Sequence, residues 1–242
     1  MTHSLFISDL HLCPERPQAT QLFEDFALRT ASQAEALYIL GDLFEYWAGD
    51  DDLTDPHHAR VARTLAELSQ SGTAVFVMHG NRDFLMGKGF ARAAHARLLP
   101  DPSLIDLYGT PTLLMHGDTL CSGDATYLSF RAKVREPAWQ AKFLSRPLAA
   151  RKAEIEQLRR LSETDKQMKS TEEMDVNPDT VDAILRAHGY PRLIHGHTHR
   201  PARHLHTVNS HDCERWVLDS WYDHGSYLRC DAAGCKAIQL KY

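Results

Sequence analysis

The run Ser4-Leu5-Phe6-Ile7-Ser8-Asp9 has an apolar centre and ends in a carboxylate, which predicts a short buried strand. Two further apolar runs, at 36–40 and 74–78, predict strands of the same kind. Between them, residues 18–32 and 58–70 carry apolar side chains at helical spacing. This alternation of strand and helix predicts an α/β fold, with a mostly parallel sheet covered by helices.

The second half of the chain changes character. A hairpin is expected at 104–108 and 112–115, and a helical pattern then runs over 124–188, with prolines at 137, 147 and 178 as expected helix boundaries. Strands are predicted to resume at 192–195, 204–208, 215–218, 227–230 and 237–240, with a turn at 231–234 before the last of them. We therefore expect a single domain over 1–242 with a helical insertion at 124–188.

Composition restricts the class of protein. The 242 residues are 43% hydrophobic and 24% charged, which is typical of a soluble globular protein and excludes disorder. The longest apolar runs are far shorter than the roughly 20 residues of a spanning helix. With no signal peptide at the start, we expect a cytoplasmic protein. The five cysteines are odd in number and lack CxxC spacing, so we expect reduced thiols. Asp50-Asp51-Asp52 lacks EF-hand spacing and is expected to be a solvated turn.

Polar residues gather where the predicted strands stop. Five such ends are Asp9-Leu10-His11, Gly41-Asp42, Gly80-Asn81-Arg82-Asp83, His116-Gly117-Asp118 and Gly196-His197-Thr198-His199. Ligands of open α/β sheets bind beyond the carboxyl ends of the strands, so these clusters are expected to form one site. Any one of these side chains alone is more often structural. Five clusters together favour a shared function.

The chemistry of this set suits two metal ions. Asp9 and His11, two apart in an extended segment, lie on one face, and the two oxygens of Asp42 can bridge two cations. Mixed nitrogen and oxygen ligands favour Mn, Fe or Zn over Mg or Ca. Two metals about 3.5–4 Å apart recur in phosphoester hydrolysis.

On these motifs the sequence resembles the calcineurin-like metallophosphoesterases, over the whole chain except the helical insertion. The resemblance implies a β-sandwich-like α/β fold with a dimetal centre. One metal would be held by Asp9, His11, Asp42 and His199, and the other by Asp42, Asn81, His116 and His197. Many members carry a proton-donating histidine after Gly-Asn, where this chain has Arg82. Arginine clamps phosphate and does not release a proton, which fits a leaving group that is itself a phosphate. The alternative is a surface arginine in a turn.

Residues 6–12, 38–52, 79–87, 115–121, 174–177 and 195–201 also resemble the UDP-2,3-diacylglucosamine diphosphatases of lipid A biosynthesis. The resemblance implies cleavage of that lipid nucleotide to UMP and 2,3-diacylglucosamine 1-phosphate (lipid X), with Mn²⁺ as the metal, by a monomer peripheral to the cytoplasmic face of the inner membrane. Asp42, Asn81, Arg82 and His116 would be catalytic. Implied substrate contacts are Asn81, Arg82, Asp124, Ser162, Lys166, Lys169 and His197. That family often has Asn at position 166, where this chain has Lys, so the family pattern supports this contact least.

The insertion carries a charge opposite to that of the chain. Residues 131–169 contain 11 lysines and arginines against five acidic residues, a net +6, whereas the whole chain is −5. The same segment carries Trp139, Phe143, Leu144, Leu148, Ile155, Leu158 and Leu161. A basic, apolar helical segment favours binding of acyl chains and of an anionic membrane surface. The alternative is a helical cap whose apolar residues are core and whose charges face solvent.

Two other functions remain open at this point. A nuclease or nucleotide phosphatase would use the same metal site, but a nucleic-acid channel needs a basic face, whereas most of this chain is acidic. We therefore expect no nucleic-acid partner. A non-enzymatic binding module would keep the fold and lose ligands, but all seven expected ligands are present.

Overall fold

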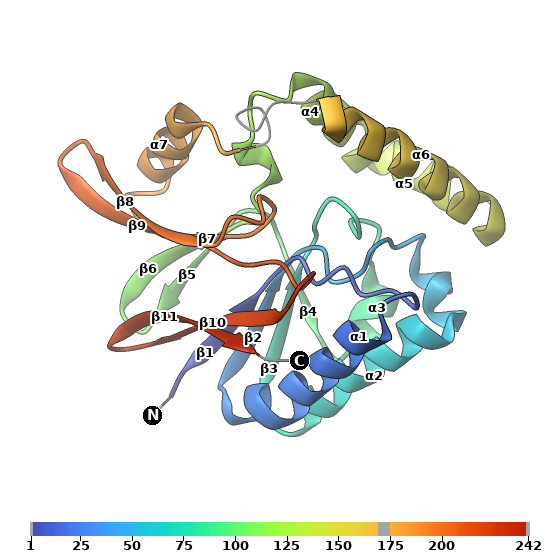
Figure 1. Ribbon diagram of the computed structural model, residues 1–242, viewed down its shortest axis with the longest axis horizontal. Helices are drawn as coiled ribbons and strands as arrows, with labels where there is room; N and C mark the ends of the chain where they lie inside the picture. The colour runs from blue at the N-terminus through green and yellow to red at the C-terminus, as the bar shows by residue number, and fades with distance from the viewer. Residues whose placement is uncertain (1, 169–174, 241–242) are drawn as a thin grey trace.

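The computed structural model describes residues 2–168 and 175–240, with 162–168 described as helical backbone. Two mixed β-sheets stack against each other, and helices cover the outer face of each (Figure 1). The core between the sheets contains Phe6, Leu40 and Met78 from one sheet and Leu114 and Ile194 from the other. The chain is thus an α/β sandwich flanked by helices, as expected.

The first sheet has the order β11-β10-β1-β2-β3-β4. Strands β1 (Ser4–Ile7), β2 (Ala36–Leu40), β3 (Ala74–Met78) and β4 (Arg97–Leu99) run parallel, and β10 (Gly225–Asp231) and β11 (Gly234–Leu240) add an antiparallel hairpin beside β1. The sequence predicted β1 through Asp9, but the strand ends at Ile7. The three-residue β4 was not predicted, because so short a strand leaves little pattern.

Three helices cover the outer face of this sheet: α1 (Pro17–Asp25), α2 (Pro56–Gln70) and α3 (Lys88–Ala93). The helix expected over 18–32 is interrupted, since a π-helical turn at Phe26–Thr30 and a 3-10 turn at Ala31–Gln33 follow α1. Phe23 and Leu65 from these helices meet Ile7, Ile39 and Val77 in a second core. Successive strand residues thus enter opposite cores, as buried parallel strands require.

The second sheet has the order β5-β6-β7-β9-β8, formed by Ser103–Leu107, Thr110–Leu114, Arg192–His195, His211–Val217 and Ala202–Val208. The expected hairpin is β5-β6. Helix α7 (Pro178–Ala187) packs Val181 and Leu185 onto the outer face of this sheet.

Between β6 and α7 the chain forms α4 (Ala125–Arg135), α5 (Pro137–Leu144) and α6 (Leu148–Met168), which extend together as an arm beside the helical side of the first sheet (Figure 1). The prolines at 137, 147 and 178 mark the starts of α5, α6 and α7, as predicted. Phe143 is buried in the core of the first sheet, and Trp139 and Ile155 pack against it. Among the described residues, no helix combines the length and apolar character needed to cross a membrane.

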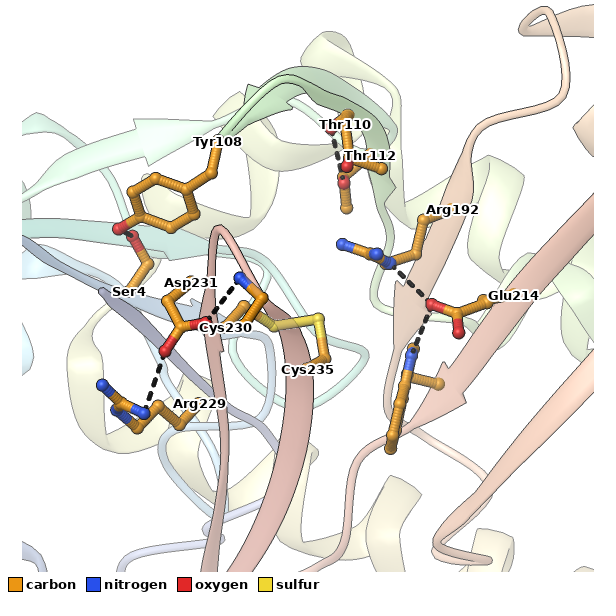
Figure 2. Close-up of a disulfide and its surroundings, with 12 residues drawn as sticks. Ser4, Tyr108, Thr110, Thr112, Arg192, Glu214, Arg229, Cys230, Asp231 and Cys235 are labelled. Atoms are coloured by element: carbon orange, nitrogen blue, oxygen red, sulfur yellow. Dashed lines mark hydrogen bonds and ion pairs between the residues drawn. A yellow bond between two sulfur atoms is a disulfide. The ribbon is translucent and has the colours of Figure 1, made fainter. Parts of the chain in front are cut away.

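The expectation that all cysteines are reduced thiols is wrong in this structure for one pair. Cys230 and Cys235 form a disulfide across the β10-β11 hairpin (Figure 2). The expected turn at 231–234 places these two residues directly opposite each other, with their Cα atoms 4.2 Å apart. Cys13, Cys121 and Cys213 are buried and remain thiols.

Candidate metal centre

The polar clusters predicted from sequence meet at the carboxyl ends of β1, β2, β3, β6 and β7. Beyond the strands, the backbone N–H of Asp9 bonds the carbonyl of Gly41 at 3.1 Å, and that of His11 bonds the carbonyl of Asp42 at 3.0 Å. Five residues at these strand ends have a left-handed backbone conformation, with φ of 55°, 49°, 51°, 70° and 54°: Asp9, His11, Asp42, His197 and His199. Non-glycine residues seldom adopt this conformation, and it concentrates where geometry serves a site.

In each of two buried carboxylates, one oxygen accepts a backbone hydrogen bond and the other faces imidazole rings. Asp42 Oδ1 accepts the backbone N–H of Arg82 at 2.8 Å, and Asp9 Oδ2 accepts that of His197 at 2.8 Å. The second oxygens face imidazoles: Asp42 Oδ2 lies 3.8 Å from His11 Nε2 and 3.9 Å from His116 Nε2, and Asp9 Oδ1 lies 3.3 Å from His199 Nε2. Asp42 therefore sits between two groups of nitrogens, where a bridging ligand would be.

The His116 ring is oriented by a contact on the side that faces away from the site. Nδ1 of His116 donates to the carbonyl oxygen of Leu40 at 2.9 Å, so Nε2 is the ring nitrogen that faces the site. Asn81 Oδ1 lies 3.0 Å from both His116 Nε2 and His197 Nδ1. An outer hydrogen bond that fixes the tautomer is the usual arrangement of a metal-binding histidine.

The residues fit divalent cations. Two ligand atoms at about 2.1 Å from one metal lie about 3 Å apart at right angles and about 4.2 Å apart when opposite. The separations here, from 3.0 Å for Asn81 and His116 to 3.9 Å for Asp42 and His116, fall within that range. Ligand atoms lie within 4.8 Å of one another in the groups Asp9, His11, His199 and Asp9, Asp42, His116. Asp9 Oδ1 and His11 Nε2 are buried and form no hydrogen bond with any residue that the structure describes. Buried polar atoms without partners are costly, and bound cations would satisfy them.

The charges at the site also favour a cation. Burial alone would lower the pKa of His116, but the carboxylates of Asp42, Asp9 and Asp118 outweigh it and raise that pKa to about 9. Burial would raise the pKa of Asp9, yet His199, His116 and His11 hold it well below its usual range. The carboxylates thus stabilise positive charge in their midst.

Sequence reasoning missed the residues that support these ligands. Asp83 Oδ2 accepts the N–H of Leu43 and Asp83 Oδ1 that of Gly80, both at 2.8 Å, so one buried side chain joins the loops after β2 and β3. Burial and the charge of Asp42 raise the pKa of Asp83 to about 6. Asp118 accepts from Arg131 Nε at 2.6 Å and from the hydroxyl of Tyr127. Asp83 and Asp118 lie inside the quoted motifs, which was the available signal.

The expected substrate contacts are distributed unevenly. Asn81 and His197 lie among the ligands, and the side chain of Arg82 lies beside them, 4.0 Å from Glu45 Oε1. Asp124 accepts the N–H of Tyr127 at 3.0 Å and caps α4, whose Tyr127 ring stacks 6.3 Å from His197. The side chains of Ser162, Lys166 and Lys169 lie outside the described residues.

Several basic side chains of the arm form ion pairs with acidic residues in the body of the protein. Arg151, 2% exposed, pairs with Asp51, Lys152 with Asp52, and Arg159 with Glu45. Asp50 accepts the backbone N–H groups of Gly87 and Gly89. The expectation that Asp50-Asp51-Asp52 is a solvated turn is therefore wrong, because these carboxylates hold a loop and the arm. The net charge of +6 overstates the charge available to an external partner.

Glycines beside the ligands leave no room for a side chain. A Cβ on Gly80 would lie 2.0 Å from Asp42 Oδ1, and one on Gly196 would lie 2.2 Å from Asp9 Oδ2. We expect Gly80→Ala to displace Asp42, to weaken metal binding, and to lower the free energy of unfolding of the metal-free protein by about 1–3 kcal/mol. Calorimetric metal titration and urea unfolding measure the two effects.

Gly72→Ala is the matched control. A Cβ there would have no atom within 4 Å, but the backbone φ of +108° is strained for any residue with a side chain. It should cost about 1–2 kcal/mol of stability with metal binding unchanged. Equal metal affinities of the two variants would contradict the packing argument at Gly80.

The comparisons with known proteins agree with this geometry. The family model of the calcineurin-like phosphoesterases matches residues 2–201, and the chain belongs to this family of metal-dependent hydrolases. Among its curated relatives, the UDP-2,3-diacylglucosamine hydrolase of Aromatoleum aromaticum is 58% identical over 96% of this chain and 94% of the relative. Those of Cellvibrio japonicus and Xanthomonas campestris pv. campestris are each 50% identical, over 96% and 98% of both chains respectively.

Proposed function

We propose that this protein hydrolyses the diphosphate of UDP-2,3-diacylglucosamine, releasing UMP and 2,3-diacylglucosamine 1-phosphate for lipid A synthesis. The observation that carries the proposal is the convergence of seven candidate ligand side chains at five strand ends, in a chain 58% identical to a relative with that name. Two Mn²⁺ ions are the proposed cofactor, since the ligands mix imidazole nitrogen with carboxylate and amide oxygen.

Each ligand has a proposed role. Asp9, His11, Asp42 and His199 hold one ion, and Asp42, Asn81, His116 and His197 hold the other. Such a pair supplies an activated water and neutralises charge on the phosphoryl group. The backbone N–H of Arg82 holds one oxygen of Asp42, which would leave the other oxygen available to the metals, and Asp83 joins the loops of Asp42 and Asn81.

Arg82 is proposed to bind the diphosphate. Its guanidinium makes paired hydrogen bonds to phosphate oxygens and keeps its charge throughout. Because the leaving group is a phosphate, it departs without a proton from the protein, so the absence of histidine at this position fits the reaction. Substrate contacts by Asp124, Ser162, Lys166, Lys169 and His197 complete the proposal.

Residues 124–188 are proposed to be a lid, inserted in one domain of 1–242, that binds the acyl chains. Exposed apolar side chains on it are Phe130, Leu144, Leu158 and Leu161. Such side chains suit a lipid ligand and the inner-membrane surface, where the protein would act as a peripheral monomer from the cytoplasmic side. Phe143 is buried in the core, so this residue fits the alternative, in which the segment is a structural cap.

Leu158→Ser together with Leu161→Ser should raise KM for the acylated substrate about 10-fold or more, because each buried CH₂ contributes about 0.8 kcal/mol. Hydrolysis of bis(p-nitrophenyl) phosphate should change little. Both reactions are measured on one preparation, with product phosphates identified by ³¹P NMR. Phe143→Ser is the comparison, since removing a core side chain should lower both activities and stability.

Equal losses on both substrates in the leucine variant would refute a lipid-binding role for the arm. Activity on single-stranded DNA with none on the lipid nucleotide would favour the nuclease alternative. The pairing of basic side chains with Asp51, Asp52 and Glu45 argues against a nucleic-acid surface.

A further inference from the structure

Glu45 lies three residues beyond Asp42, in the loop that follows β2. Its backbone N–H donates to the carbonyl oxygen of Leu12 at 3.1 Å, which fixes it beside the loop that carries His11. Its side chain is only 12% exposed, so both carboxylate oxygens must find partners within the protein.

One oxygen of Glu45 faces a proposed metal ligand. Glu45 Oε2 lies 3.2 Å from Nδ1 of His11, while Nε2 of the same ring lies 3.8 Å from Asp42 Oδ2. The ring therefore lies between two carboxylates, with Nδ1 on the side of Glu45 and Nε2 on the side of Asp42. A carboxylate behind a metal-binding histidine orients the ring and increases its basicity.

The other oxygen of Glu45 faces the arm. Glu45 Oε1 accepts from Arg159 Nη2 at 2.6 Å and lies 4.0 Å from Arg82 Nη1. Arg159 belongs to α6, 114 positions away in sequence. One side chain thus contacts both the candidate metal site and α6, a helix that forms ion pairs with the body through Arg151, Lys152 and Arg159.

We propose that Glu45 is a positioning residue that links occupancy of the metal site to the docking of α6. A metal on His11 fixes the ring and, with it, the Glu45 carboxylate that Arg159 binds. Docking of α6 in turn holds Glu45 behind His11. Because linkage is reciprocal, metal must favour the docked arm by the same factor as the docked arm favours metal. The inference rests on the metal centre proposed above.

The first test measures Mn²⁺ affinity of the full-length, metal-free protein by competition with a chelator. Glu45→Gln should weaken binding about 10- to 100-fold, the range found when such outer partners are changed. Arg159→Met should weaken it about two- to five-fold, because the ion pair is partly exposed. The control is Arg160→Met, at an exposed position that pairs with Glu156 on the same helix, and its affinity should match wild type.

The second test measures amide hydrogen exchange of 148–161 with and without Mn²⁺. Metal should slow exchange there in the wild type and in Arg160→Met, and should have no effect in Glu45→Gln or Arg159→Met. A purely structural role for Glu45 would lower stability without abolishing this metal response. The proposed link would be overturned if Mn²⁺ left the exchange rate of 148–161 in the wild type unchanged. It would also be overturned if Arg159→Met and Arg160→Met bound Mn²⁺ with equal affinity.

His11→Ala separates this inference from the proposed function. If that variant binds Mn²⁺ as tightly as wild type, the proposed metal centre itself is wrong. If it loses Mn²⁺ while Glu45→Gln retains wild-type affinity, the metal centre stands and the role of Glu45 is refuted.

Discussion

Asp42→Asn should remove at least one metal ion per chain and lower kcat about 10³-fold. Asparagine retains an oxygen for the N–H of Arg82, but its amide nitrogen replaces the oxygen that lies between His11 and His116. An amide nitrogen does not bind a metal ion, so the bridge proposed for Asp42 should be lost. Metal catalysis contributes several kcal/mol to such reactions, and each 1.4 kcal/mol is tenfold in rate.

Metal content by mass spectrometry and turnover of the lipid nucleotide are measured together for this variant. Asp106→Asn is the control, because Asp106 is an exposed carboxylate in the β5-β6 hairpin and should leave both quantities unchanged. Full metal content with near-normal turnover in Asp42→Asn would refute a bridging role.

Arg82→Ala should lower the rate about 10²- to 10³-fold with both metals retained. Removing one preorganised charge donor to the reacting group has this effect in other enzymes. The contact that fixes Asp42 is the backbone N–H of Arg82, which the alanine variant keeps, so the metal site should persist.

Arg82→Lys distinguishes charge from geometry. Lysine keeps the charge but lacks the planar pair of donors, so only partial recovery is expected. Loss of metal as the main effect of Arg82→Ala would assign Arg82 a structural role. Recovery to the full rate in Arg82→Lys would show that charge alone suffices.

The sequence predicted most of the fold because strands and ligands obey local rules. Apolar runs of about five residues located β1, β2 and β3, and the polar residue after each run located Asp9, Asp42 and Asn81. The carboxyl ends of parallel strands lie at the same edge of a sheet, so the topology predicted that the polar clusters would lie close together. Prolines located the helix starts of the arm for an equally local reason.

What the sequence could not provide depends on pairings between distant segments. Glu45 looks like an ordinary acidic residue until the loops after β1 and β2 are placed together. Asp83 lies inside a motif, but its role in joining the loops after β2 and β3 is visible only in the structure. The basic residues of α6 suggested an external anion, but several meet Asp51, Asp52 and Glu45, about 100 positions away. The disulfide depends on the register of β10 and β11, which a predicted turn alone does not fix.

Titration of the metal-free protein with Mn²⁺, following UMP release from UDP-2,3-diacylglucosamine, tests the central claim most directly. Activity should appear only as the second ion binds, and the products should be UMP and 2,3-diacylglucosamine 1-phosphate in equal amounts. Full activity with one ion per chain, or a metal-loaded protein that leaves this substrate intact while cleaving bis(p-nitrophenyl) phosphate, would contradict it.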